Sequence, residues 1–131
     1  MISQKLHFIV IDDSKLDCFI AEKVIRNTGM SESTHSFIDA REALAYIADN
    51  TNTEVQTILI VDIHMPMMNG FEFVEAFEKL PADMQKCYII YILSSSINEN
   101  DLNRVKNYPA VRHFLSKPLT SNTLTALLER L

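Results

Sequence analysis

The sequence predicts an α/β fold, in which one doubly wound parallel sheet of five strands carries helices on both faces. Two observations support this prediction. Nearly continuous apolar runs rich in Ile and Val alternate with stretches whose apolar residues recur at helical spacing. Such runs are typical of strands buried on both faces of a parallel sheet. Their alternation with helices favours right-handed crossovers, which place helices on both sides of the sheet.

Five runs predict the strands. Three are strongly apolar and two are weaker because polar residues interrupt them. In chain order the predicted strands are Leu6–Ile11, Ser33–Ile38, Ile58–Val61, Tyr88–Leu93 and Val111–Leu115.

The first predicted helix begins at Ser14 and ends near Gly29, because Ser is a favoured N-cap and Gly a favoured C-cap residue. Asp17, three residues after Ser14, completes the pattern of a capping box. The apolar residues at helical spacing are Leu16, Phe19, Ile20 and Val24.

N-cap residues and helix-breaking residues predict four more helices in the same way. They are predicted to begin at Asp39, Asn69, Asn98 and Thr120. The second ends near Ala48, Pro81 is expected to stop the third, and the last continues to Leu131. The chain therefore reads as five strands and five helices in strict alternation.

Length and composition fit one domain over residues 1–131. Hydrophobic residues make up 47% of the chain and charged residues 22%, near the average for globular domains. The net charge of −5 argues against nucleic acid as the main partner, because phosphate binding requires a basic patch. No apolar run approaches the ~20 residues of a membrane helix, and residues 1–5 are too polar for a signal peptide. We therefore expect a cytoplasmic protein.

Charged residues follow three of the predicted strands. Asp12 and Asp13 follow the first, Asp62 follows the third, and Lys117-Pro118 follows the last. The carboxyl ends of parallel strands meet at one edge, where open α/β sheets bind ligands. Two like charges at about 4 Å repel by roughly 4 kcal/mol at an effective dielectric constant of about 20. The cluster therefore implies a bound cation, a shifted protonation state, or both.

At these residues the chain resembles the receiver domain of two-component response regulators, and the resemblance covers essentially the whole chain. Five features carry it in order: Asp12-Asp13, Asp62, the segment Met65–Gly70 (like the family's MPxMxG loop), Ser94 and Lys117-Pro118. The resemblance implies a flavodoxin-like sheet with strand order 2-1-3-4-5 and a cis Lys-Pro peptide bond.

The resemblance makes Asp62 the phosphoacceptor, a carboxylate nucleophile that forms an acyl phosphate. It implies a Mg²⁺ site in which Asp13 and Asp62 bind the ion directly, the backbone carbonyl of His64 is a third ligand, and Asp12 acts through water. Mg²⁺ suits this set because it is a hard ion that prefers oxygen. Alternatives remain open: Asp62 as a helix or loop cap, and the acidic pair as a cap for the helix beginning at Ser14.

The other family positions fall on Lys117, Ser94 and Phe114. By resemblance, Lys117 pairs with Asp62 at rest and with a phosphoryl oxygen after transfer. Ser94 donates a hydrogen bond to the phosphoryl group, and Phe114 is the switch aromatic that moves inward with it. The alternatives are a solvated surface lysine for Lys117 and ordinary core packing for Phe114.

His64 and Ser96 lie two residues after Asp62 and Ser94, at positions that border the phosphoryl group in the family and tune its lifetime. His64 could alternatively bind a metal through its ring, although no second His is spaced to help it. The neighbouring methionines are expected to pack the loop against the core; they are Met65, Met67 and Met68.

The function implied is a phosphorylation-gated interaction module rather than an enzyme with external substrates. A sensor histidine kinase or a histidine phosphotransfer protein supplies the phosphoryl group. A downstream protein then binds the face built from the fourth helix, the fifth strand and the fifth helix. Since one domain fills the chain, output is expected through a partner or through a segment outside this sequence.

Two other classes of protein are less consistent with this sequence. An aspartyl-nucleophile phosphohydrolase of the haloacid-dehalogenase type carries Asp-x-Asp after its first strand, whereas Asp62 stands alone after the third. A flavodoxin-like nucleotide binder needs a Gly-rich phosphate loop, and the chain has only Gly29 and Gly70. Cys18 and Cys87 lack metal-ligand spacing and are expected to be reduced and buried.

Overall fold

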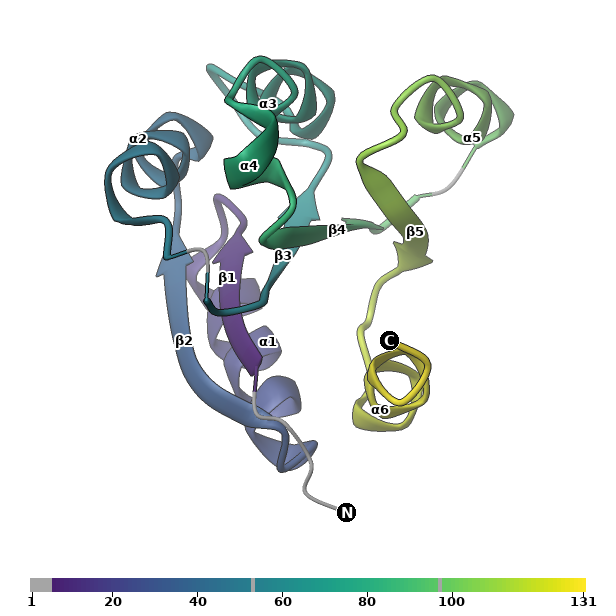
Figure 1. The fold of residues 1–131 in the computed structure, drawn as a ribbon. Coiled ribbons are helices and arrows are strands. Elements are labelled where there is room, and N and C mark those ends of the chain that lie inside the picture. The colour runs from purple at the N-terminus through teal and green to yellow at the C-terminus, as the bar shows by residue number, and fades with distance from the viewer. Residues whose placement is uncertain (1–5, 53, 97) are drawn as a thin grey trace.

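The computed structural model describes residues 6–52, 54–96 and 98–131, which form a five-stranded parallel sheet between two layers of helices (Figure 1). The order is β2-β1-β3-β4-β5, as the resemblance implied. Residues 1–5, on which the prediction about a signal peptide depends, lie outside the described part. The strands are β1 (Leu6–Ile11), β2 (Ser31–Phe37), β3 (Thr57–Asp62), β4 (Tyr88–Ser94) and β5 (Val111–Ser116).

All five predicted strands are confirmed, with small shifts at their ends. Asp62 and Ser94 are the last residues of β3 and β4 rather than the first residues after them. Every residue of β3 is buried, since this strand lies at the centre of the sheet. The strand β2 starts two residues earlier than predicted, because its polar sequence at the sheet edge gives no clear alternation to mark its start.

The helices form two layers, with α2, α3 and α5 on one side of the sheet and α1 and α6 on the other (Figure 1). None of the described helices has the length and apolar character needed to cross a bilayer. The bounds are α1 (Lys15–Asn27), α2 (Ala40–Asn50), α3 (Gly70–Phe77), α4 (Ala82–Gln85), α5 (Glu99–Val105) and α6 (Ser121–Leu128).

The prediction of five helices is wrong by one, because Pro81 does not simply end the third helix. It is the N-cap of the single-turn helix α4, with φ of −55°, and a proline φ near this value suits the start of a helix. The last helix also stops earlier than predicted, with Glu129 as its C-cap.

Each face of the sheet buries its own hydrophobic cluster. Under α2 and α3 the cluster includes Ile11, Val61 and Phe73, and under α1 and α6 it includes Phe8 and Leu124. Burying such a side chain contributes about 1.5–3 kcal/mol, so the two clusters hold both helix layers on the sheet. The free thiols, Cys18 and Cys87, are buried as predicted.

Helix α1 packs through a different face from the one that the apolar pattern indicates. Its buried residues are Cys18, Ala21 and Ile25. Both sets satisfy helical spacing, and the smaller side chains face the sheet. The exposed set is Leu16, Phe19 and Ile20.

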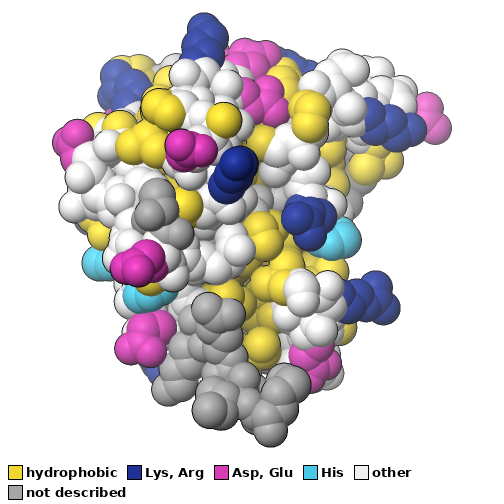
Figure 2. Space-filling view, viewed as in Figure 1, with side chains coloured by type: hydrophobic (Ala, Val, Ile, Leu, Met, Phe, Trp, Pro, Cys, Tyr) yellow, Lys and Arg dark blue, Asp and Glu magenta, His cyan; other side chains and the backbone are white. Residues whose placement is uncertain are grey.

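Figure 2, viewed as in Figure 1, shows acidic and basic side chains interspersed on another face, around an area of hydrophobic side chains next to α6.

Candidate functional site

Three carboxylates meet at the carboxyl ends of β1 and β3, which are neighbours in the sheet. Carboxylate oxygens of Asp12, Asp13 and Asp62 all lie within 4.8 Å of one another. Asp12 and Asp62 are buried, whereas Asp13 is exposed. The structure thus brings together the three carboxylates that the sequence placed at one edge.

Asp62 is held by close backbone packing at the start of α3. The Gly70 N–H donates to the Ile63 carbonyl over 2.9 Å. A Cβ on Gly70 would lie 2.8 Å from the Asp62 carbonyl oxygen and 2.9 Å from the Ile63 Cα, which is too close for any other residue without a backbone shift. Asn69 and Glu72 form a capping box that begins α3 at this point. The end of β3 is therefore fixed against the helix that follows it.

Burial raises the pKa of Asp62 from 3.8 to about 6, and the charge of Asp12 adds to this rise. The ammonium of Lys117 and a backbone hydrogen bond from His64 act in the opposite direction without cancelling it. The pocket therefore carries more negative charge than its own groups neutralise. A hard divalent cation fits this set of oxygen donors, because it would relieve the repulsion among them.

Lys117 reaches into the pocket from the loop after β5. Its Nζ donates to Asp12 Oδ2 over 2.9 Å and to Asp17 Oδ2 over 2.8 Å, and it lies 3.7 Å from Asp62 Oδ1. Burial tends to lower the pKa of Lys117, but its hydrogen bonds to the two carboxylates outweigh burial and raise it. The predicted pairing with Asp62 thus exists as a long ion pair only. The Lys117-Pro118 bond is cis, as the resemblance implied.

Asp17 is the site residue that the sequence did not reveal. Its spacing from Ser14 predicts a capping box, and half of that box is present, since Ser14 Oγ accepts from the Asp17 N–H over 3.1 Å. The Ser14 N–H, however, donates to Asp12 Oδ1 over 3.0 Å. The Asp17 carboxylate therefore binds Lys117 instead. The available signal was its position in the first turn of a helix that begins at the carboxyl edge of the sheet.

Ser94 is fully buried at the end of β4, and its hydroxyl bonds within its own loop. Its Oγ donates to the Ser96 carbonyl over 2.8 Å, and the Ser96 N–H returns a bond to Oγ over 3.2 Å. The Ser94 carbonyl accepts from the Lys117 N–H over 2.8 Å. Phe114 is half-buried and packs against the cluster under α2 and α3. Ser94 therefore touches the lysine loop, while its hydroxyl is already satisfied.

His64 and Ser96 are both exposed at the rim. Among the described residues, the only group of three or more side chains arranged to hold a metal is the aspartate group, so the His64 ring is not part of it. Met65 and Met68 pack against the core as predicted. The same prediction for Met67 is wrong: this side chain is 74% exposed and its φ is 69°, so the left-handed backbone turns it outward.

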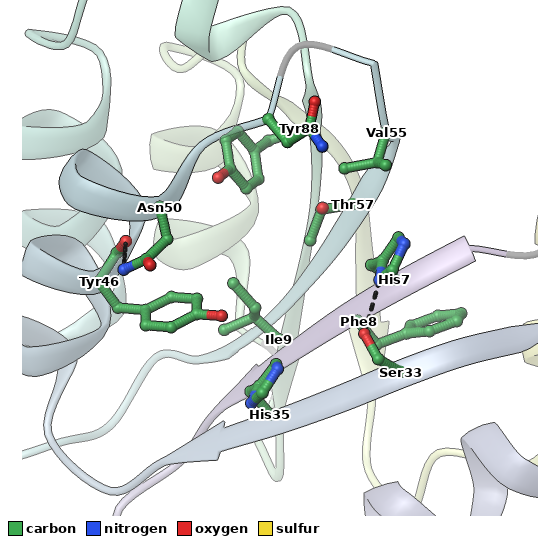
Figure 3. Close-up of a pocket in the computed structure, with 11 residues that line it drawn as sticks. His7, Phe8, Ile9, Ser33, His35, Tyr46, Asn50, Val55, Thr57 and Tyr88 are labelled. Atoms are coloured by element: carbon green, nitrogen blue, oxygen red, sulfur yellow. Dashed lines mark hydrogen bonds between the residues drawn. The ribbon is translucent and has the colours of Figure 1, made fainter.

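A separate cavity of about 280 Å³ lies at the opposite, amino end of the sheet (Figure 3). His7, His35, Tyr46 and Tyr88 point toward it from β1, β2, α2 and β4. His7 Nδ1 lies 2.6 Å from Ser33 Oγ, and the His35 ring packs against Tyr46. None of the described residues that line it is Asp, Glu, Lys or Arg, so it lacks the charged chemistry of the carboxyl edge.

The strand order and the lysine-containing acidic pocket define a flavodoxin-like α/β domain with its site at the carboxyl edge. The family model of the response regulator receiver domain matches residues 8–129. The chain therefore belongs to the response regulator receiver domain family, whose members are signalling domains of two-component systems.

Solved structures agree with this assignment. A response regulator receiver protein from Dyadobacter fermentans is 29% identical over 95% of this chain and 96% of that chain, with a TM-score of 0.87. The chemotaxis protein CheY4 of Vibrio cholerae is 25% identical over 96% and 98%, with a TM-score of 0.78. The receiver domain of a sensor histidine kinase from Pseudomonas aeruginosa, with magnesium coordinated in its active-site cleft, shares the fold at 14% identity, 96% coverage of each chain and a TM-score of 0.77.

Proposed function

We propose that residues 1–131 form a phosphoacceptor domain in which Asp62 takes up a phosphoryl group in a Mg²⁺-dependent reaction in the cytoplasm. The donor is a sensor histidine kinase or a histidine phosphotransfer protein. The observation that carries the proposal is the pocket in which Asp12, Asp13 and Asp62 face Lys117. Magnesium in the cleft of a receiver domain with the same fold supports the choice of ion.

The chemistry follows from the groups in the pocket. An Asp62 carboxylate oxygen attacks phosphorus as the P–N bond to the donor histidine breaks, and the electron pair returns to the imidazole. In this proposal Lys117 pairs with the phosphoryl oxygens, on which negative charge is spread during transfer; its Nζ, 3.7 Å from Asp62 Oδ1, supports this role. Mg²⁺, held by Asp13 and Asp62, by the His64 carbonyl and through water by Asp12, would supply further positive charge at these oxygens when bound.

An apolar surface beside the pocket supports a protein donor. Leu16, Phe19 and Ile20 expose their side chains on α1. Ile20 also lines a small cavity together with Lys117 and Pro118, so this surface continues into the site. A donor protein must bring its phosphohistidine within bonding distance of Asp62. An apolar surface on the donor would then bury the exposed Leu16, Phe19 and Ile20 side chains of α1.

The proposed switch starts at Ser94. Its hydroxyl now donates to the Ser96 carbonyl, so donation to a phosphoryl group requires an exchange of acceptors. That exchange would move the loop between β4 and α5. Phe114, on the neighbouring strand β5, is half-buried, so an inward movement would bury the part of its ring that is now exposed. The charge gained on phosphorylation, about −1.5 to −2, is large enough to bias such an equilibrium.

Helix α5 carries this movement to the surface. Arg104 on α5 stacks over the Phe71 ring of α3 at 4.3 Å, and the Tyr108 hydroxyl donates to Glu75 of α3. The Arg104 and Glu75 side chains are about half exposed, so their polar contacts can rearrange at low cost. We infer that a downstream protein binds the face formed by α5, β5 and α6.

The rival function, an aspartyl-nucleophile phosphohydrolase, finds no support in the comparisons. The family match covers most of the chain and is to a signalling domain. The acidic pair follows β1 and Asp62 ends β3, so the arrangement is not the Asp-x-Asp of that enzyme class.

The test is covalent labelling. Wild type, Asp62→Asn and the control Asp49→Asn, which removes an exposed carboxylate from α2, are incubated with Mg²⁺ and a small acyl-phosphate donor. Intact-mass spectrometry should show one phosphoryl group on wild type and control, and none on Asp62→Asn. Equal labelling of all three proteins would refute the assignment of Asp62.

A further inference from the structure

We propose that Asp17 is a positioning residue for phosphoryl transfer: it holds the Lys117 ammonium on the α1 side of the pocket until a phosphoryl group on Asp62 competes for it. This inference rests on the proposed function. It extends that function, because the resemblance to receiver domains gave no role to Asp17. In this inference Asp17, a residue of helix α1, controls how readily the Lys117 ammonium can bind a phosphoryl oxygen.

The geometry shows how the ammonium is shared. A lysine ammonium has three donors, and two of them meet Asp12 Oδ2 at 2.9 Å and Asp17 Oδ2 at 2.8 Å. The distance to Asp62 Oδ1 is 3.7 Å, beyond a hydrogen bond. Lys117 is thus shifted toward β1 and α1, away from the carboxylate that it is to assist.

Asp17 is a fixed anchor, because the backbone around it is tied to the same pocket. Its own N–H donates to Ser14 Oγ over 3.1 Å, and the Ser14 N–H donates to Asp12 Oδ1 over 3.0 Å. Further along α1, the Val24 carbonyl accepts from Ser121 Oγ of α6 over 3.4 Å. Helix α1 is therefore connected to the segment around Lys117 both by the lysine itself and by Ser121, at the start of α6.

The two close contacts of Lys117 differ in how readily they can be exchanged. The Asp12 side chain is 5% exposed, whereas that of Asp17 is 37% exposed. Removing the partner of a buried charge is costly, while an ion pair open to water is worth little. When a phosphoryl oxygen arrives, Lys117 therefore gives up Asp17 and keeps Asp12.

Loss of the Asp17 charge should make Lys117 more available. An ion pair at a partly exposed position changes an equilibrium by up to about fivefold. Asp17→Asn should therefore bind the phosphoryl mimic beryllofluoride, with Mg²⁺, about three- to fivefold more tightly than wild type. It should be labelled by a small acyl-phosphate donor faster by a similar factor. Asp17→Glu keeps a carboxylate and should remain near wild type.

A double-mutant cycle separates positioning from a merely structural role. Beryllofluoride dissociation constants are measured from NMR shifts for wild type, Asp17→Asn, Lys117→Ala and the double variant, with Asp49→Asn as the charge-matched control. Because Asp17 acts through Lys117, its substitution should change the affinity only when the lysine is present. Urea unfolding checks that each protein is folded, and Asp17→Ser removes the same charge if Asp17→Asn does not fold.

Two results would overturn the inference: an Asp17→Asn affinity and labelling rate equal to wild type, or the same gain in the Lys117→Ala background. An equal gain in Asp49→Asn would also overturn it, since net charge alone would then explain the effect. Failure of the proposed function looks different, because wild type itself would then take up no phosphoryl group on Asp62.

Discussion

Replacing Asp62 by Asn should make the metal-free protein more stable, although it removes the proposed phosphoacceptor. Asp62 is buried beside Asp12 and near Asp13, and the Lys117 ammonium donates its hydrogen bonds to Asp12 and Asp17 instead. Asn has nearly the same shape and no charge, and its amide can donate to the neighbouring carboxylates. The substitution therefore removes repulsion without opening a cavity.

The magnitude follows from the pKa of Asp62, which burial and Asp12 raise from 3.8 to about 6. Because folding raises this pKa, the native state binds more protons than the unfolded chain at intermediate pH. The stability of wild type therefore falls as pH rises through this window, and the loss is complete above about pH 6. It amounts to about 3 kcal/mol at pH 8 and about 1 kcal/mol at pH 4.5.

Urea unfolding followed by circular dichroism, with a chelator present, measures the difference at both pH values. Asp62→Asn should exceed wild type by about 2–3 kcal/mol at pH 8, and the gain should shrink to about 1 kcal/mol at pH 4.5. Asp49→Asn, on an exposed part of α2, should show no such pH dependence. Added Mg²⁺ should stabilise wild type more than Asp62→Asn. A variant less stable than wild type at pH 8, or a gain independent of pH, would refute the electrostatic reasoning.

Four further predictions concern the metal, the backbone, the phosphoryl lifetime and the output face. Asp13→Ala should weaken Mg²⁺ binding more than Asp12→Ala in calorimetric titration, because only the former would remove a proposed direct ligand; equal losses would contradict this. Gly70→Ala should lower the free energy of unfolding by about 1–3 kcal/mol, measured in urea, because its Cβ meets the end of β3 at 2.8 Å; an unchanged midpoint would show that the loop adapts. Substitution of His64 or Ser96 should alter the decay rate of the acyl phosphate in mass spectra while labelling is retained, and a double variant with wild-type decay would exclude both. Beryllofluoride should change amide exchange on α5, β5 and α6 more than on α2, whereas changes confined to the pocket would indicate a phosphoryl relay without a switch.

Much of the fold, and the grouping of three aspartates in the candidate site, follow from local patterns. The apolar runs predict the five strands because a central parallel strand must be apolar on both faces, and β3 is buried throughout. The three aspartates could be grouped because each is at or next to a strand end, and parallel strands bring their carboxyl ends to one edge. The strand order came from the resemblance, since periodicity does not say which strands are neighbours.

The sequence did not determine the structure where one pattern is compatible with two arrangements. On α1, two sets of residues have helical spacing, and only packing against the sheet shows that Cys18 and Ala21 face inward while Phe19 faces solvent. Pro81 is compatible with ending one helix or beginning another, and the structure shows that it begins α4. Packing against neighbouring segments decides between the two arrangements. A short stretch of sequence does not contain this information.

The sequence by itself determined most of the chemical groups that this protein brings to the carboxyl edge of its sheet, namely three aspartates, a serine and a lysine, but it did not reveal Asp17. The tertiary structure decided which of them bond to one another. Lys117 pairs closely with Asp12 and Asp17, which lie 105 and 100 positions away along the chain, rather than with Asp62. The physical reason is that ion pairs and hydrogen bonds form only within a few ångströms. Folding alone sets such distances between segments this far apart in the chain.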